Sequence, residues 1–186
     1  MRALHEKKKY TYQDYCQLPN EVRAEILDGE LLMSPSPFRK HQEISGKIYR
    51  LLAQWVETHC LGEVYNAPFD VVLSQYDIVQ PDLLYISYER KSILTEANVQ
   101  GAPDLVIEIL SSGDKKRDTV KKKAIYEKYG VKEYWIVNPD AETISVFILE
   151  EKVFQEKGIY KRNQVLESTL LPGFSLVLED VFQSND

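Results

Sequence analysis

The chain has 186 residues, of which 44% are hydrophobic and 28% are charged, and its net charge is −6. This composition is ordinary for a globular protein and excludes a mostly disordered chain. The length suits a single domain over residues 1–186, in which residues 1–20 form a polar lead-in. No apolar run reaches the ~20 residues of a membrane span, and the charged first ten residues do not resemble a signal peptide. Cys16 and Cys60 lie outside any Cys-x-x-Cys pattern, which favours reduced thiols and a cytoplasmic location.

The first expected elements are a hairpin and a long helix. Asp28-Gly29 is typical of a primed hairpin turn, and it lies between two apolar segments, 24–27 and 31–33. The Ser-Pro-Ser-Pro segment at 34–37 breaks the chain before a helix predicted over about Arg39–Cys60. One face of that helix is apolar, because hydrophobic residues recur at spacings of three and four. They are Ile44, Ile48, Leu51, Leu52 and Trp55.

The remainder of the chain predicts a mixed sheet. Strands are expected over Phe69–Leu73, Ile78–Ser87, Asp104–Leu110 and Glu133–Val137, with a helix over about Asp114–Tyr129 that ends at Gly130. Short strands and turns from Thr143 to Leu178 predict a β-rich C-terminal meander. This order indicates an α/β (α+β) fold, in which helices pack on a mixed β-sheet.

Glu108 is the most informative residue, because it interrupts an otherwise aliphatic central strand. A buried carboxylate is costly unless positive charge meets it. Two partners are possible, a cation from the protein or a metal ion. Strand alternation places Val106, Glu108 and Leu110 on one face.

Asp82 and Lys122 are the other two candidates. Asp82 follows Pro81 at the start of an apolar strand, where proline suits a strand start or a bulge that aims an acid at a site, although a Pro-Asp pair is usually just a turn. Lys122 lies on the helix after the Glu108 strand, and it could equally form an ordinary helical ion pair with Asp118. Tyr126 lies on the same helical face and could share the site.

Together the three residues suit phosphodiester hydrolysis. That reaction needs a metal ion to neutralise charge and to lower the pKa of the attacking water. Mg²⁺ takes oxygen ligands and usually one or two protein carboxylates. A lysine then orients the water or stabilises the transition state.

The sequence resembles the Uma-two family, which is assigned to the PD-(D/E)XK restriction-endonuclease-like superfamily. The resemblance covers about residues 20–180. Its motifs are Gln80-Pro81-Asp82, the segment Gly101–Ser111, Asp118 through Lys122 to Tyr126, Gly130–Val137, Glu25 with Asp28-Gly29, and residues 34–37 with His41.

The resemblance implies a restriction-endonuclease-like core in which Asp82 and Glu108 bind Mg²⁺ or Mn²⁺. The sequence departs from the superfamily pattern at Leu110, where a lysine is expected two residues after the glutamate. The resemblance implies that Lys122, on the following helix, takes the place of that lysine. The expected activity is metal-dependent cleavage of DNA, and a homodimer would supply one active site for each strand.

Further residues are candidates for accessory roles. His41 is either a proton carrier or phosphate contact, or a helix-start residue bonded to backbone. Glu25 is either a further acid of the metal site or a cross-strand partner in the hairpin. Residues 115–123 hold six basic residues and one acid, a local charge of +5 that leaves −11 on the rest of the chain. This segment suits contact with DNA phosphates, or a plain solvated helix face. The expected phosphate contacts are Lys115, Lys116, Arg117 and Lys121.

Rival functions use the same residues differently. A catalytically inactive nuclease-fold module that binds nucleic acid or protein is favoured by the acidic net charge and by Leu110, and it would be indifferent to Mg²⁺. A two-carboxylate glycosidase fits Asp82 and Glu108 but has no use for the basic helix. A zinc site is not expected, because the histidines and cysteines show no ligand spacing.

Overall fold

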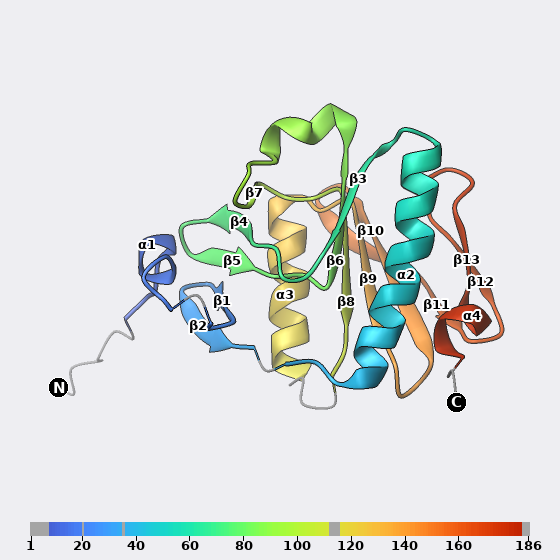
Figure 1. The fold of residues 1–186 in the computed structure, drawn as a ribbon, viewed down its shortest axis with the longest axis horizontal. Helices are drawn as coiled ribbons and strands as arrows, with labels where there is room; N and C mark the ends of the chain where they lie inside the picture. The colour runs from blue at the N-terminus through green and yellow to red at the C-terminus, as the bar shows by residue number, and fades with distance from the viewer. Residues whose placement is uncertain (1–7, 20, 35, 112–115, 184–186) are drawn as a thin grey trace.

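The computed structural model describes residues 8–19, 21–34, 36–111 and 116–183 (Figure 1). The side chains of residues 116–118 lie outside that description. Among the described residues, no helix is both long and apolar enough to cross a membrane.

Six strands form a mixed sheet at the centre of the fold. They are β3 (Gly62–Asn66), β6 (Leu83–Ser87), β8 (Leu105–Ile109), β9 (Glu133–Asn138), β10 (Thr143–Glu150) and β11 (Val153–Lys161). Their order across the sheet is β11-β10-β9-β8-β6-β3. β8 and β9 are parallel, and the other neighbouring strands of this sheet are antiparallel. β8 lies inside the sheet, as its aliphatic sequence predicts, because strands buried on both faces are almost continuously apolar.

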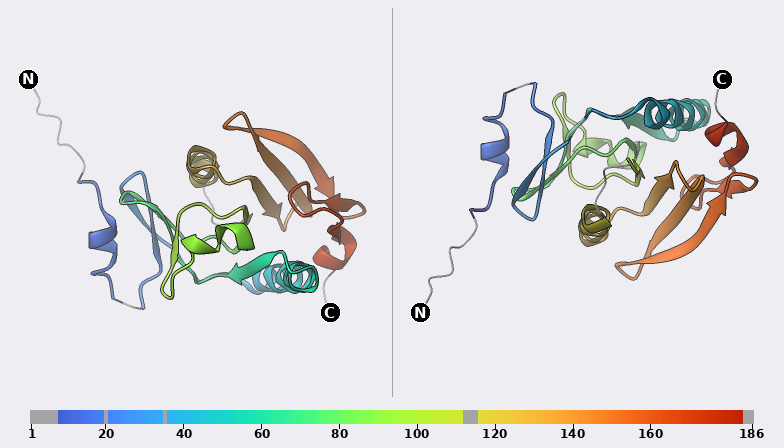
Figure 2. Two further views of the ribbon diagram at one scale, coloured as in Figure 1. Left: turned by 90° about the horizontal axis from the view of Figure 1, so that it is seen from above. Right: turned by 90° about the horizontal axis from the view of Figure 1, so that it is seen from below.

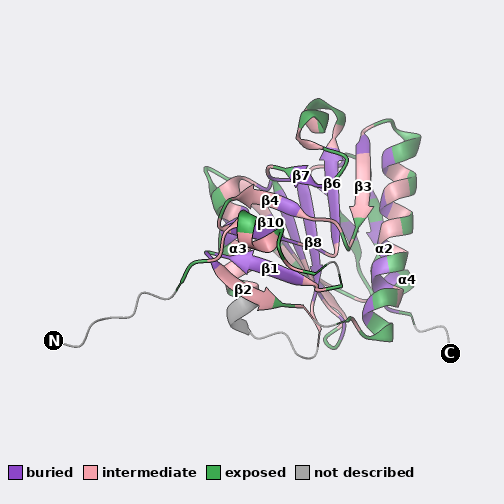
Figure 3. Cartoon of the chain, turned by 60° about the vertical axis from the view of Figure 1, so that its left-hand side comes forward, coloured by how far each residue is buried: buried purple, intermediate pink, exposed green. Residues whose placement is uncertain are grey.

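Residues of β8 alternate between two hydrophobic cores. Leu105 and Ile107 pack with α2 (Arg39–Thr58) and with α4 (Leu178–Phe182). They also pack with a two-stranded sheet formed by β12 (Val165–Glu167) and β13 (Ser175–Val177). Val106 packs in the other core, with α3 (Lys116–Tyr129). The two long helices therefore cover opposite faces of the sheet (Figure 2). β6 and β8, between these helices, are buried along almost their whole length (Figure 3).

A second sheet of five strands, called the small sheet below, lies on the α3 side of the molecule. Its order is β2 (Glu30–Met33), β1 (Ala24–Leu27), β5 (Asp77–Val79), β4 (Val71–Ser74) and β7 (Val99–Gln100). β1 and β2 form the predicted hairpin, and its turn residues Asp28 and Gly29 have φ angles of 52° and 77°. Both angles are left-handed, as a primed turn requires. The sequence analysis expected one sheet, and this second sheet was missed.

The single strand predicted over Ile78–Ser87 is wrong. The chain leaves the small sheet after Val79 and enters the central sheet at Leu83, so residues 80–82 connect two different sheets. Pro81 lies in this connection, and a proline cannot donate a hydrogen bond to a strand ladder. Asp82 therefore lies one residue before β6 begins, rather than within a strand.

Two further segments differ from the expectations. α2 ends at Thr58, and β3 then begins at Gly62, where no strand was predicted. A Cβ atom at Gly62 would lie 2.1 Å from the carbonyl oxygen of Ile86, so only glycine permits this close pairing of β3 with β6. The polar lead-in contains α1 (Tyr12–Tyr15), whose capping box is formed by Thr11.

The C-terminal meander has two separate parts. β10 and β11 form a hairpin that extends the central sheet, whereas β12 and β13 pair only with each other. α4 then packs on α2 through buried Val181 and Phe182, which belong to the same core as the apolar face of α2.

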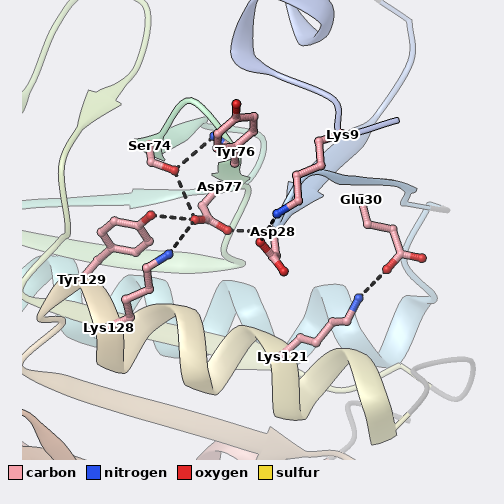
Figure 4. A network of polar contacts seen from close by, with 9 residues as sticks. All are labelled: Lys9, Asp28, Glu30, Ser74, Tyr76, Asp77, Lys121, Lys128 and Tyr129. Carbon is pink, nitrogen blue, oxygen red and sulfur yellow. Dashed lines mark hydrogen bonds and ion pairs between the residues drawn. The ribbon is translucent and has the colours of Figure 1, made fainter. Parts of the chain in front are cut away.

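A polar network docks α3 onto the small sheet (Figure 4). The Asp77 carboxylate, which is 2% exposed, accepts hydrogen bonds from the Tyr129 hydroxyl at 2.6 Å and the Asp28 amide at 2.8 Å. Lys128 Nζ lies 3.4 Å from the same carboxylate. Lys121 forms an ion pair with Glu30 at the other end of the helix. These contacts hold α3 in a fixed position over the central sheet.

Asp104 is a structural acid, and we expect Asp104→Asn to destabilise the fold without changing any site. Its carboxylate is fully buried and accepts hydrogen bonds from the Ser87 amide at 2.8 Å and from Lys132 at 2.7 Å. Burial alone would raise the pKa of Asp104, but these hydrogen bonds outweigh it and hold the pKa below 3.8. The loss should be about 1–2 kcal/mol, because Lys132 is half exposed and can return to water.

The pH dependence of this loss follows from the lowered pKa. The charge on Asp104 stabilises the folded state above pH 3.8, and the contribution disappears as pH falls through the folded-state pKa. Urea denaturation of wild type and Asp104→Asn should therefore differ most near neutral pH and converge in acid. An equal difference at all pH values would contradict this assignment.

Candidate metal centre

Asp82 and Glu108 lie beside each other across neighbouring strands. β6 pairs with β8 so that Leu83 lies opposite Ile107, and one step further along the ladder places Asp82 opposite Glu108. The amide of Ile109 donates a hydrogen bond to Asp82 Oδ2 at 2.7 Å, which ties the two strand ends together. Both acids line one cavity of about 460 Å³.

Lys122 reaches Glu108 from α3. Its Nζ lies 3.0 Å from Glu108 Oε1 and 2.8 Å from Glu25 Oε1, and its side chain is only 16% exposed. Tyr126, one helical turn later, donates its hydroxyl to the same Glu108 oxygen at 2.6 Å. The two residues lie on one face of α3 because positions four apart share a helical face. Of the two partners considered for a buried Glu108, the cation from the protein is present.

Glu25 and His41 complete the group. Glu25, on β1, also accepts the Gln80 amide at 2.7 Å, so the small sheet contributes one wall of the cavity. His41 lies in the first turn of α2, and its Nε2 is 3.1 Å from Asp82 Oδ2. Six side chains, from α2, the central sheet, α3 and β1, therefore meet where β6 begins and β8 ends.

Each of the three acids keeps one oxygen without a hydrogen-bond donor among the described residues. Asp82 is contacted through Oδ2, Glu108 through Oε1 and Glu25 through Oε1. With all three acids ionised, three carboxylates and one ammonium would leave two negative charges in this group. Carboxylate oxygens without protein donors, next to excess negative charge, suit a hard divalent cation.

The geometry limits how such an ion is held. Among the described residues, no three His, Cys, Asp or Glu side chains are grouped closely enough to bind one metal ion. Mg²⁺ does not require three, because it keeps several water ligands and binds through one or two carboxylates. Asp82 and Glu108 fit this demand as a pair, and Glu25 is engaged mainly with Lys122.

The electrostatics of the group favour added positive charge. Burial raises the pKa of Glu108 to about 7, Lys122 lowers it, and Asp82 and Glu25 raise it further. Burial acts to lower the pKa of Lys122, but Glu108 and Glu25 outweigh it and hold that pKa above its usual value. The raised pKa keeps Lys122 protonated near neutral pH.

The family model described as "Uma2: Putative restriction endonuclease" matches residues 11–179 of the chain. The chain belongs to the Uma2 family. The match spans all six residues of the group and both of the larger sheets. It confirms the family that the sequence motifs predicted.

Structural comparison supports the same fold. A crystal structure described as a putative nuclease belonging to DUF820 from Anabaena variabilis ATCC 29413 superposes with a TM-score of 0.78 and 20% sequence identity. The match covers 92% of this chain and 97% of that chain. At this identity the likeness shows a shared fold, which confirms the predicted mixed sheet with flanking helices. No curated protein matches the chain.

The three described lysines of the basic segment of this Uma2 chain, Lys121, Lys122 and Lys123, do not share one charged face. Lys121 pairs with Glu30, Lys122 is buried at the acids, and Lys123 Nζ lies 3.7 Å from the centroid of the Phe147 ring. Consecutive helical residues point about 100° apart, so three adjacent lysines must face different surroundings. Lys115 and the side chains of Lys116 and Arg117 lie outside the described residues. Their expected contact with DNA stays a prediction.

Tyr134, on β9, lines the same cavity as the acids, and the sequence predicted no role for it there. Burial and the nearby Glu108 raise the pKa of Tyr134 well above its usual value, so its hydroxyl keeps its proton. The cavity rim is partly apolar, because Phe38 and Met33 are 67% and 63% exposed there.

Proposed function

We propose that this protein is a metal-dependent nuclease that hydrolyses phosphodiester bonds of DNA, with Mg²⁺ or Mn²⁺ as cofactor. The observation that carries the proposal is the pair of Asp82 and Glu108 across β6 and β8, with a buried ammonium from Lys122 beside it. Membership of the Uma2 family supports the nuclease class. The metal, the substrate and the residue roles are our proposal.

Asp82 and Glu108 would hold the divalent ion. When bound, that ion neutralises phosphate charge and lowers the pKa of the attacking water. Lys122 stays protonated and stabilises the negative charge that develops on the phosphate. His41 and Tyr126 hold the two acids in place through their hydrogen bonds to Asp82 and Glu108.

The mouth of the cavity supports a nucleic-acid substrate. α2 begins there without a side-chain cap and without an acid in its first turn, which leaves its N-terminal amides suited to phosphate oxygens. The exposed ring of Phe38 beside them offers an apolar surface to a base or sugar. The basic start of α3 would add backbone contacts, and a homodimer would place one such site on each strand of a duplex.

The test is a cleavage assay on supercoiled plasmid, with single-stranded DNA and RNA of matched sequence in parallel. We expect nicking with Mg²⁺ or Mn²⁺, none with EDTA, and a rate that falls steeply with added NaCl because phosphate contacts release counterions. Cleavage of RNA but not of DNA would show that the substrate is RNA and would overturn the proposed DNA substrate. A protein that cuts nothing with either metal would overturn the proposed activity.

A binding module without catalysis is the second candidate, and the Lys122 contacts favour it. Because Lys122 already forms ion pairs with Glu25 and Glu108, the buried acids do not require a metal for folding. This alternative predicts DNA binding that EDTA does not weaken, with no cleavage. Gel-shift and nicking assays on the same sample separate the two functions.

A further inference from the structure

The hydroxyl of Tyr134 is a buried polar group that the site described so far does not use. Tyr134 is fully buried, and its oxygen has no hydrogen-bond partner among the described residues. Its side chain lines the cavity that contains Asp82 and Glu108. Two other buried groups lack partners in the described part of the chain, Trp55 Nε1 and Ser87 Oγ, but neither residue lines this cavity.

The position of this hydroxyl is fixed by the packing of its ring. The ring centroid of Tyr134 lies 5.1 Å from that of Tyr126, 6.1 Å from that of Phe147 and 5.8 Å from that of Phe154. On β9, Tyr134 lies opposite Val106 of β8, on the same face as Glu108. A rigid aromatic cluster therefore fixes the side chain of Tyr134 against the cavity that it lines.

A buried hydroxyl without a partner destabilises a protein, and phenylalanine would fill the same volume without that cost. Tyr126 does not share this problem, because its hydroxyl donates to Glu108. The hydroxyl of Tyr134 therefore indicates an oxygen-bearing ligand inside the cavity. The depth of the group, at 0% exposure, suits a water molecule better than a bulky phosphodiester.

We propose that the Tyr134 hydroxyl, together with the Lys122 ammonium, binds and orients the water that attacks the phosphodiester bond. This inference rests on the proposed nuclease function. It makes Tyr134 a water-binding residue of the reaction, with a neutral hydroxyl that donates or accepts one hydrogen bond. The ordered water is aligned before the substrate arrives, which lowers the cost of positioning it in the transition state.

The test is Tyr134→Phe, compared with wild type and with Tyr85→Phe. Tyr85 packs in the core on the other face of the sheet, and its hydroxyl donates to the Leu61 carbonyl oxygen at 3.0 Å. For Tyr134→Phe we expect kcat to fall about a hundredfold, as for loss of one aligned polar group. We expect KM for DNA and the Mn²⁺ affinity from calorimetry to stay within about twofold, and Tm not to fall. Tyr85→Phe should keep the wild-type kcat.

Crystal structures supply a readout that does not depend on activity. The wild-type structure should contain an ordered water within hydrogen-bond distance of the Tyr134 hydroxyl, and the Tyr134→Phe structure should lack it. No water at the hydroxyl, or a variant that cuts at the wild-type rate, would overturn the role of Tyr134 alone. A wild-type protein that cuts no nucleic acid would overturn the proposed function and this inference with it.

Discussion

Glu108→Gln is expected to abolish metal-dependent cleavage while leaving the fold intact. Glutamine has the same shape and can still accept the Tyr126 hydroxyl, but it lacks the charge that a divalent ion requires. Loss of the ion removes several kcal/mol of transition-state stabilisation, which corresponds to about a thousandfold in kcat. Nicking assays and calorimetric Mn²⁺ titration measure the two losses.

The matched control for this variant is Asp104→Asn. Both residues are buried acids, Glu108 within β8 and Asp104 directly before it, but Asp104 is bonded to Ser87 and Lys132 and does not line the cavity. Asp104→Asn should lose stability and keep activity, whereas Glu108→Gln should lose activity. Lys122 keeps Glu25 as a partner in Glu108→Gln, so the loss of stability should stay below the roughly 3–5 kcal/mol typical of a buried charge left without compensation. Wild-type cleavage by Glu108→Gln would show that the metal centre is elsewhere or absent.

The sequence predicted the centre of this site because its strongest signal is local. A lone glutamate within an aliphatic strand is unusual, and the structure shows it buried and paired with a cation. Strand alternation correctly placed Glu108 on the same face as Val106. The spacing of Lys122 and Tyr126 likewise placed both on one helical face. Such inferences hold because helix and strand periods are fixed by backbone geometry.

Other features could not be predicted because they depend on contacts between distant segments. Asp82 meets Glu108 only through the antiparallel register of β6 and β8, which a 17-residue connection, residues 88–104, separates in sequence. The break at Pro81 looked like a strand start, but nothing local showed that the chain changes sheets there. Asp77 and Glu133 resemble Glu108 as buried acids, yet they are satisfied by structural hydrogen bonds.

Tyr134 shows the same limit at the level of a single atom. Its place in an aromatic and aliphatic strand predicts packing, and the ring does pack in a core. Whether the hydroxyl has a hydrogen-bond partner depends on residues that are distant in the sequence. No local pattern in the sequence can therefore predict it. Lys121, Lys122 and Lys123 differ in surroundings for another reason, because charges adjacent in sequence spread around a helix in space.

Lys122→Met is expected to destabilise the fold strongly, and divalent metal should restore part of the loss. Removal of one partner from a buried ion pair costs about 3–5 kcal/mol, because the remaining charge is left without compensation. Here Glu25 and Glu108 would both lose the ammonium that lies 2.8 and 3.0 Å from them. Urea denaturation with EDTA and with Mn²⁺ measures the loss and its recovery, since a ligand that binds only the folded state stabilises it.

Lys121→Met is the matched control for Lys122→Met, because the neighbouring lysine forms only a partly exposed ion pair with Glu30. Its cost should stay below about 1 kcal/mol, and Mn²⁺ should add no more stability than it adds to wild type. Lys122→Met should still bind Mn²⁺ but cleave DNA far more slowly, which separates the role of Lys122 from that of Glu108. If Mn²⁺ stabilises Lys122→Met no more than Lys121→Met, the acids that surround Lys122 do not form a cation site.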